Sequence, residues 1–271
     1  MNDRQTGKEY RFTNDLMFCH VMTSNPDLAG QLLERILGFE IGHVKVIETQ
    51  KTLNYAPDSH SVRLDVYMKN STDIFDVEMQ TGRPIDLPRR MRYYQAANTC
   101  EDFKAGESYR RLKNCYVIFI CEDDPFGKDD VFYRFRMKCD GYEDLPYDDG
   151  SCNIVLNYNG NNGTVSEELR NLLNYLKTGD PFDKLTENLH NEVERTNHDE
   201  NWRRKAMTIE EKIRMTAEDA REEGIRKGEH KKMISSVSSL LSKGIVAGEE
   251  EACELLGYDL NEYAEAKKLL H

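Results

Sequence analysis

The stretch RLDVYMKNSTDIFDVEMQ, residues 63–80, contains two segments that alternate like β-strands but carry acidic side chains inside them. Asp65 lies in the first segment and Glu78 in the second, and the neutral amide of Gln80 ends the second. A short polar turn around Asn70 separates the two segments. The pattern therefore predicts a β-hairpin with carboxylates in the middle of its strands.

Apolar alternation fixes the register of this hairpin. The apolar faces of the two strands coincide if residues 70–73 form the turn and Met68 pairs with Phe75. The same register places Asp65 directly opposite Glu78, where two carboxylates would repel each other. A divalent cation between them would remove this penalty. The alternative is a solvated sheet face on which Arg63 neutralises Asp65 from a diagonal position.

A magnesium ion fits such a pair because Mg²⁺ is usually held by one or two carboxylates, waters and phosphate oxygens. It can polarise a phosphodiester and help to generate hydroxide. Gln80 lies one step along the same strand face as Glu78 and could orient the attacking water or a phosphate oxygen. Because the amide is neutral, Gln80 cannot stabilise an anionic transition state as a lysine would.

The composition excludes several classes of protein. The 271 residues are 38% hydrophobic and 32% charged, and the net charge of −12 counts against a general basic coat for nucleic acid. The seven cysteines include no CxxC pair and are expected to be reduced, cytosolic thiols. No apolar leader or membrane-length apolar run is evident, so the expected location is cytoplasmic, with no membrane partner. HExxH, GxSxG and Gly-rich phosphate-loop motifs are all missing.

The order of the predicted elements indicates an α/β core in which an antiparallel meander leads into a crossover helix. We expect helices at 13–22, 25–38, 86–106 and 166–179, and strands at 44–53, 61–69, 73–80, 113–122, 131–139 and 151–159. Residues 181–201 are polar and predict a linker or a solvated helix. Residues 202–271 predict a charged helical region whose role stays open between partner recruitment, a homodimer and solubilisation.

Several motifs resemble those of one nuclease family. The Asp65, Glu78 and Gln80 pattern within an αβββαβ core resembles the signature of the PD-(D/E)XK nuclease superfamily. The segments NDLMFCHVM, RRMRYYQ and GESYRRLKNCYVIFI are similar to those of its transposase branch, the recombination-promoting nuclease family. The resemblance covers about residues 10–180. It implies a restriction-endonuclease-like αβββαβ core with a mixed central sheet over residues 1–180, followed by a C-terminal helical extension.

The resemblance also implies an activity, namely Mg²⁺-dependent DNA endonuclease chemistry of a mobile-element type, with Mn²⁺ as a substitute metal. Asp65 and Glu78 would bind the metal, Gln80 would stand in the place of the superfamily lysine, and Asp15 would add a carboxylate at the edge of the site. Asp15 has an alternative explanation as a first-turn acid favoured by the helix dipole. Cys19 stands where many relatives have lysine.

The neutral Gln80 also keeps a second function open. In this alternative the chain is a catalytically weak or inactive nuclease-fold module that acts in DNA binding or protein assembly. Leu64 departs from the family pattern as well, because a proline usually precedes the aspartate.

The segment 81–113 is the best candidate for DNA contact, with eight basic and four acidic side chains. Helix N-termini attract phosphate, and arginine adds a fork of donors. The predicted backbone contacts are Arg89, Arg90, Arg92, Tyr93 and Gln95. The alternative is an ordinary solvated helix face. No base-reading element is evident, so the expected binding is weak and salt-sensitive.

Overall fold

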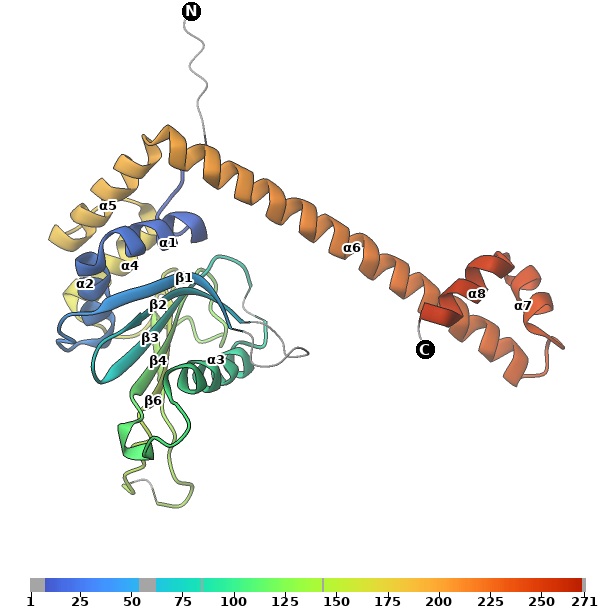
Figure 1. The fold of residues 1–271 in the computed structure, drawn as a ribbon, viewed down its shortest axis with the longest axis horizontal. Helices are drawn as coiled ribbons and strands as arrows, with labels where there is room; N and C mark the ends of the chain where they lie inside the picture. Colours follow the sequence, from blue (N-terminus) through green and yellow to red (C-terminus); the bar gives the residue numbers. More distant parts are fainter. Residues whose placement is uncertain (1–7, 54–61, 84, 143, 270–271) are drawn as a thin grey trace, which may run out of the picture. The chain divides into compact units, whose positions relative to one another are not determined.

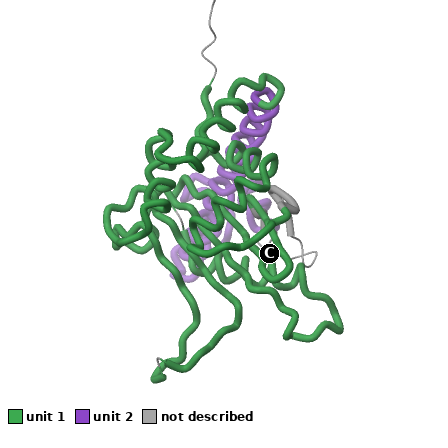
Figure 2. The backbone as a smooth tube through the Cα atoms, turned by 90° about the vertical axis from the view of Figure 1, so that its left-hand side faces the viewer, with its two compact units in different colours: residues 1–202 green, residues 203–271 purple. Residues whose placement is uncertain are grey.

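The computed structural model describes residues 8–53, 62–83, 85–142 and 144–269, apart from the side chains of 46–53 and 62–64. The chain divides into two compact units, Met1–Trp202 and Arg203–His271 (Figure 2). No helix within the described ranges combines the length and apolarity needed to cross a membrane. All seven cysteines are among the described residues, and none forms a disulfide.

The first unit is built on a mixed six-stranded sheet in the order β1-β2-β3-β4-β6-β5. The strands are β1 (Lys45–Leu53), β2 (Val62–Lys69), β3 (Asp73–Gln80), β4 (Asn114–Cys121), β5 (Phe132–Phe135) and β6 (Ser151–Asn157). β3, β4 and β6 are parallel to one another, and the other neighbouring strands pair antiparallel. The mixed central sheet expected from the sequence is therefore confirmed, and β5 forms its edge.

Helices cover both faces of this sheet (Figure 1). One face carries α1 (Asp15–Ser24) and α2 (Pro26–Leu37), with α4 (Glu167–Thr178) and α5 (Lys184–Asn197) packed beside them. The other face carries α3 (Leu87–Asp102), and a 3₁₀ turn, Tyr109–Arg111, lies between α3 and β4. The Asn14 side chain caps α1, and Gly38 ends α2 in the left-handed conformation.

The acid-bearing face of β3 lies under α3. Leu87, Met91, Tyr94 and Ala97 of α3 form a buried cluster with residues of one sheet face: Tyr67, Ile74, Cys115, Val117, Phe119, Cys121 and Val155. Because side chains alternate, Asp76, Glu78 and Gln80 lie on the same side of β3 as Ile74. The carboxylates are therefore enclosed between sheet and helix.

The segment 181–201, expected as a linker or a solvated helix, contains α5. Its amphipathic pattern buries Leu185, Leu189 and Val193, and a capping box between Asp183 and Thr186 starts the helix. Hydrogen bonds in both directions between Asn197 and the Tyr10 backbone, 3.0 and 2.9 Å long, fasten the N-terminal segment to α5. α5 is thus a packed part of the first unit.

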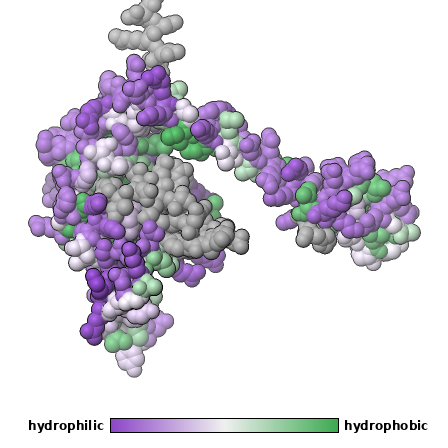
Figure 3. Space-filling model, viewed as in Figure 1, coloured by the Kyte–Doolittle hydropathy of each residue, from purple (hydrophilic) through white to green (hydrophobic). Residues whose placement is uncertain are grey.

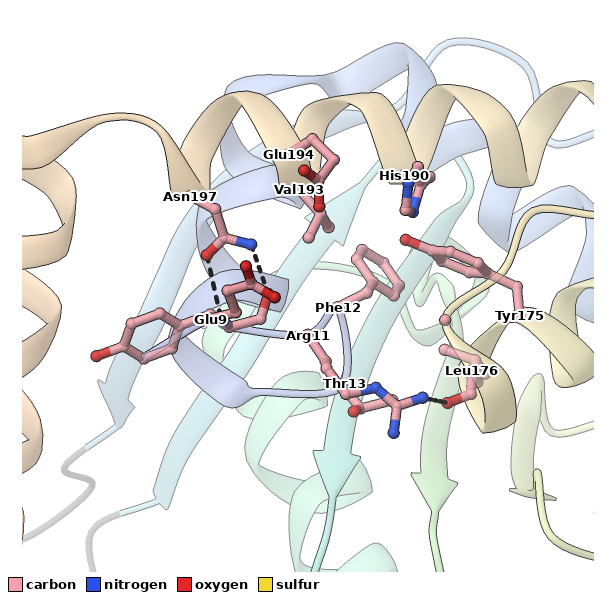
Figure 4. Close-up of a pocket in the computed structure, with 12 residues that line it drawn as sticks. Glu9, Arg11, Phe12, Thr13, Tyr175, Leu176, His190, Val193, Glu194 and Asn197 are labelled. Carbon is pink, nitrogen blue, oxygen red and sulfur yellow. Dashed lines mark hydrogen bonds between the residues drawn. The ribbon is translucent and has the colours of Figure 1, made fainter. Parts of the chain in front are cut away.

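A cavity of about 100 Å³ lies between the N-terminal segment, α4 and α5 (Figure 4). Arg11 closes one side of it by donating to the backbone carbonyls of Leu176 and Lys177, and the rings of Tyr175 and His190 meet edge to face. Neither the hairpin carboxylates nor Gln80 line this cavity. The hydrogen bonds of Arg11 at its edge attach the N-terminal segment to α4.

The second unit contains most of α6 (Glu200–Ser242), together with α7 (Glu249–Leu256) and α8 (Leu260–Leu269). Its small core gathers the end of α6 with the two short helices: Met233, Val237, Val246, Ala252, Cys253 and Tyr263. Residues 211–229 of α6 are exposed at every position, and the visible surface of this helix is largely hydrophilic (Figure 3). In this part, α6 is stabilised by its own backbone hydrogen bonds and by ion pairs one turn apart, such as that of Arg214 with Glu218.

Gly224 and Gly228 should weaken this exposed part of α6. A Cβ added at either glycine would meet nothing within 4 Å. Replacing both with alanine should therefore stabilise the helix by about 1 kcal/mol at each position. Circular dichroism should show more helix and a higher melting temperature, and unchanged or lower helicity would contradict the expectation. As a control, Gly163→Ala should destabilise, because its φ is +86° and the new Cβ would meet Asp130.

Candidate active site

The β2–β3 hairpin has the register expected from its apolar faces. Met68 pairs with Phe75, and Val66 pairs with Val77. Within the described strands the β2–β3 ladder ends at this second pair, although β2 continues along β1 and β3 continues along β4 as far as Gln80. The pairing of β2 with β3 therefore stops at Val66 and Val77, and the two strands separate at the adjacent residues Asp65 and Glu78.

Two side-chain contacts replace the ladder at this opening. The Asp65 backbone N–H donates to Glu78 Oε1 over 2.9 Å, and the Met79 backbone N–H donates to Asp65 Oδ2 over 3.0 Å. In an antiparallel ladder that continued, Met79 would bond the backbone of Leu64 instead. Each carboxylate is thus fixed by the main chain of the opposite strand, and we call this arrangement the carboxylate crossing.

Glu78 is strongly desolvated in the crossing. The residue is 5% exposed, and burial raises its pKa well above the usual range. The charges of Asp76 and Asp65 raise this pKa further, while the Asp65 N–H and the Arg90 guanidinium act in the opposite direction. Several carboxyl groups therefore lie in one poorly solvated region, where their negative charges would repel one another.

Asp76 is a member of this group that the sequence did not single out. It is completely buried, and Asn98 of α3 donates to its Oδ2 over 2.9 Å. The Oδ1 atoms of Asp76 and Asn98 are both buried without a hydrogen-bond partner. Burial raises the pKa of Asp76 to about 7, with the Asp65 charge adding to the effect and the Asn98 bond opposing it. Strand alternation was the available signal, because Asp76 shares a face with Glu78.

Gln80 and Arg90 form a second polar contact beside the carboxylates. Arg90 Nη1 donates to Gln80 Oε1 over 2.9 Å, and Gln80 Nε2 donates to the carbonyl oxygen of Gly82 over 3.0 Å. The Arg90 guanidinium also lies 5.1 Å from the ring centroid of Phe119 and 5.8 Å from that of Tyr94. The amide of Gln80 is therefore oriented at both ends.

The donor set suits a hard divalent cation. Asp65 and Glu78 each have a second oxygen, and a cation bound to both carboxylates would offset their mutual repulsion. Among the described residues, no group of three or more His, Cys, Asp or Glu side chains forms a complete metal site. Mg²⁺ does not need one, because waters and substrate phosphate supply the remaining oxygens.

Asp15 lies at the start of α1 and is exposed. It precedes Cys19 by one helical turn, and the Cys19 thiol donates to the Asp65 carbonyl oxygen over 3.3 Å. Asp15 therefore lies on the α1 side of the sheet, one helical turn from the contact with the Asp65 backbone, whereas the side chains of the carboxylate crossing lie on the α3 side. The side chain of Arg63, the alternative partner for Asp65, lies outside the described residues.

The predicted DNA-contact residues point in different directions. Arg89, Arg92 and Tyr93 are exposed on α3. Arg90 is only partly exposed and turns towards Gln80. Gln95 faces the sheet, where its Nε2 lies 3.0 Å from each of three acceptors: the carbonyl oxygens of Cys115 and Cys152, and Asn153 Oδ1. Its amide donors thus serve to fasten α3 to β4 and β6.

A protein-family model described as PD-(D/E)XK nuclease family transposase matches residues 12–233. The chain belongs to this family. The match includes the sheet, both layers of helices and much of α6. The same comparisons found no matching curated protein and no matching solved structure. PD-(D/E)XK transposases are nucleases of a mobile-element type.

Asp76 should make stability fall with rising pH in the metal-free protein. Its folded-state pKa of about 7 lies above the ordinary value of 3.8, so the folded state binds the extra proton between these values. The contribution of Asp76 to the free energy of unfolding is therefore fully present below pH of about 4. It is lost as pH rises to about 7, at a rate of at most about 1.4 kcal/mol per pH unit.

Asp76→Asn should flatten this dependence, because the amide is neutral and still accepts from Asn98. Urea unfolding in EDTA from pH 4 to pH 8 measures the effect. Asp27→Asn, at an exposed position of α2, is the control and should keep the wild-type slope. Equal slopes for Asp76→Asn and wild type would show that Asp76 does not titrate in this range.

Proposed function

We propose that the protein is a Mg²⁺-dependent DNA endonuclease that hydrolyses phosphodiester bonds at the carboxylate crossing. The observation that carries this proposal is the reciprocal fixing of Asp65 and Glu78 where β2 and β3 separate. Preorganised ligands of this kind cost no rearrangement when metal and substrate arrive. Family membership supports the same reaction class.

Each residue has a defined task in this proposal. Asp65 and Glu78 hold the metal, with Asp15 as a further carboxylate at the edge of the site. The metal, Mg²⁺ or Mn²⁺, would polarise the phosphodiester and lower the pKa of a bound water. Gln80 uses its remaining N–H to orient the water or a phosphate oxygen, since its oxygen accepts from Arg90 and its nitrogen already donates to Gly82.

The first turns of α3 would dock the DNA backbone. Arg89, Arg92 and Tyr93 are exposed there, near a helix N-terminus that favours phosphate. Contacts of this kind fix position and register without reading bases. The net charge of −12 limits long-range attraction, so binding should depend on these local contacts.

Cleavage of supercoiled plasmid in Mg²⁺ tests the activity. The wild type should nick or linearise it, and EDTA should stop the reaction. Asp65→Asn and Glu78→Gln keep an oxygen for each backbone N–H but remove the charge that holds the metal. Each should lower the rate about 1,000-fold, because the metal supplies several kcal/mol of transition-state stabilisation. Asp27→Asn should cut like wild type, and full activity in both site variants would refute the assignment.

A second function, an inactive nuclease-fold module that binds DNA or assembles proteins, is favoured by one observation: residue 80 is a neutral glutamine. Calorimetric titration with Mg²⁺ and Mn²⁺ separates the two functions. Binding that Glu78→Gln abolishes supports the endonuclease. Plasmid that stays intact together with no metal binding would favour the inactive module.

The DNA contacts should appear in the salt dependence of binding. Arg89→Met and Arg92→Met should weaken binding to duplexes of different sequence equally, and each should reduce the salt slope by about one. Fluorescence anisotropy across a series of KCl concentrations measures both quantities. Lys184→Met, on an exposed side chain of α5, is the control and should leave the slope unchanged. Unequal effects among sequences would instead indicate base readout.

A further inference from the structure

We propose that Arg90 is a catalytic residue whose guanidinium contacts the scissile phosphate and supplies the positive charge that residue 80 lacks. The inference rests on the proposed endonuclease function and deepens it. It assigns to Arg90 a task different from that of its exposed neighbours on α3.

Phosphodiester hydrolysis needs a positive charge that Asp65, Glu78 and Gln80 do not provide. Negative charge builds up on the phosphate oxygens and the leaving oxygen as the bond breaks. Asp65 and Glu78 are acidic and Gln80 is neutral, so these three side chains bring only negative or neutral groups to the reaction. A cation from elsewhere in the chain would stabilise the transition state.

Arg90 has a suitable position. It lies in the first turn of α3, and its bond of 2.9 Å to Gln80 Oε1 places the guanidinium beside the last residue of the carboxylate-bearing strand. The guanidinium is therefore held next to the strand that carries Glu78.

The charge of Arg90 is also available to a ligand. The salt bridges of the described residues include none to Arg90, whose guanidinium donates to the neutral amide of Gln80 and packs on Phe119 and Tyr94. These contacts fix the side chain without neutralising it. A guanidinium has five N–H donors, and the bond to Gln80 uses one of them. Donors thus remain for a phosphate oxygen, which arginine binds well.

The neighbouring arginines provide matched comparisons. Arg89 is 81% exposed at its side chain and lies 3.8 Å from Asp86, and Arg92 is exposed on the outer side of α3. These two side chains suit docking of the DNA backbone. Arg90 alone among the three contacts the end of β3.

Single-turnover cleavage at saturating DNA separates catalysis from docking. Arg90→Met should lower the rate about 100-fold, the usual loss when one group that stabilises the transition state is removed. Arg90→Lys keeps the charge and should lose less. Arg89→Met and Arg92→Met should raise the DNA concentration needed for saturation, whereas Lys184→Met, at an exposed position of α5, should leave both this concentration and the rate unchanged.

The double variant Arg90→Met/Gln80→Lys tests the charge directly. A lysine at position 80 returns a cation to the same place and should restore the rate at least about tenfold over Arg90→Met. Arg90 also packs on two rings, so melting temperatures are measured for every variant. A loss of rate that follows melting temperature instead of charge would overturn the proposal.

Calorimetry with Mg²⁺ alone gives a readout that needs no cleavage. Removing the positive charge of Arg90 beside the carboxylate-bearing strand should tighten Mg²⁺ binding by Arg90→Met several-fold, because like charges repel each other. Arg89→Met should change it less. If the wild type binds Mg²⁺ but does not cut, the endonuclease proposal and the catalytic role of Arg90 fail together.

If the wild type cuts and Arg90→Met cuts equally fast at saturating DNA, only the Arg90 assignment fails. If the wild type neither cuts nor binds Mg²⁺, the endonuclease function and the Arg90 assignment fail together.

Discussion

The exchange of hydrogen bonds between two acidic side chains and the opposite main chain is the constraint on which the site depends. At the opening of the sheet, Glu78 accepts from the Asp65 backbone and Asp65 accepts from the Met79 backbone. The second bond gives the Met79 N–H a partner in place of the Leu64 backbone, and both bonds orient the carboxylates. A substitution that removes either side chain therefore removes both a proposed ligand and a support of the strand pair.

α3 closes the acidic face and supplies its balancing groups. Asn98 donates to Asp76, and Arg90 reaches Gln80 and lowers the pKa of Glu78 against the effect of burial. The apolar residues Leu87 and Met91 of the same helix pack on the sheet and exclude water. The surroundings that desolvate the acids thus also provide donors to them, as is typical of sites with shifted pKa values.

The hairpin register could be predicted because apolar alternation on β2 and β3 permits only one matching of their faces. The break in the ladder could not, since it depends on how carboxylates compete with carbonyl oxygens for the Met79 N–H. Gln95 looked like a phosphate contact from its place in an arginine-rich helix, but its side chain faces β4 and β6. Only the three-dimensional packing of α3 distinguishes the inward Gln95 from the outward Arg92.

The attachment of Gln95 has a consequence for the shape of the substrate. Its hydrogen bonds to the backbones of β4 and β6 fasten α3 to the centre of the sheet, so the helix cannot slide independently of the strands. The exposed arginines and the inward guanidinium of Arg90 then move as one rigid body with the acids of β3. A nucleic acid held at this surface must present its phosphates at a spacing fixed by the helix. The protein would thereby measure backbone geometry, such as groove width or strand curvature, without contacting any base.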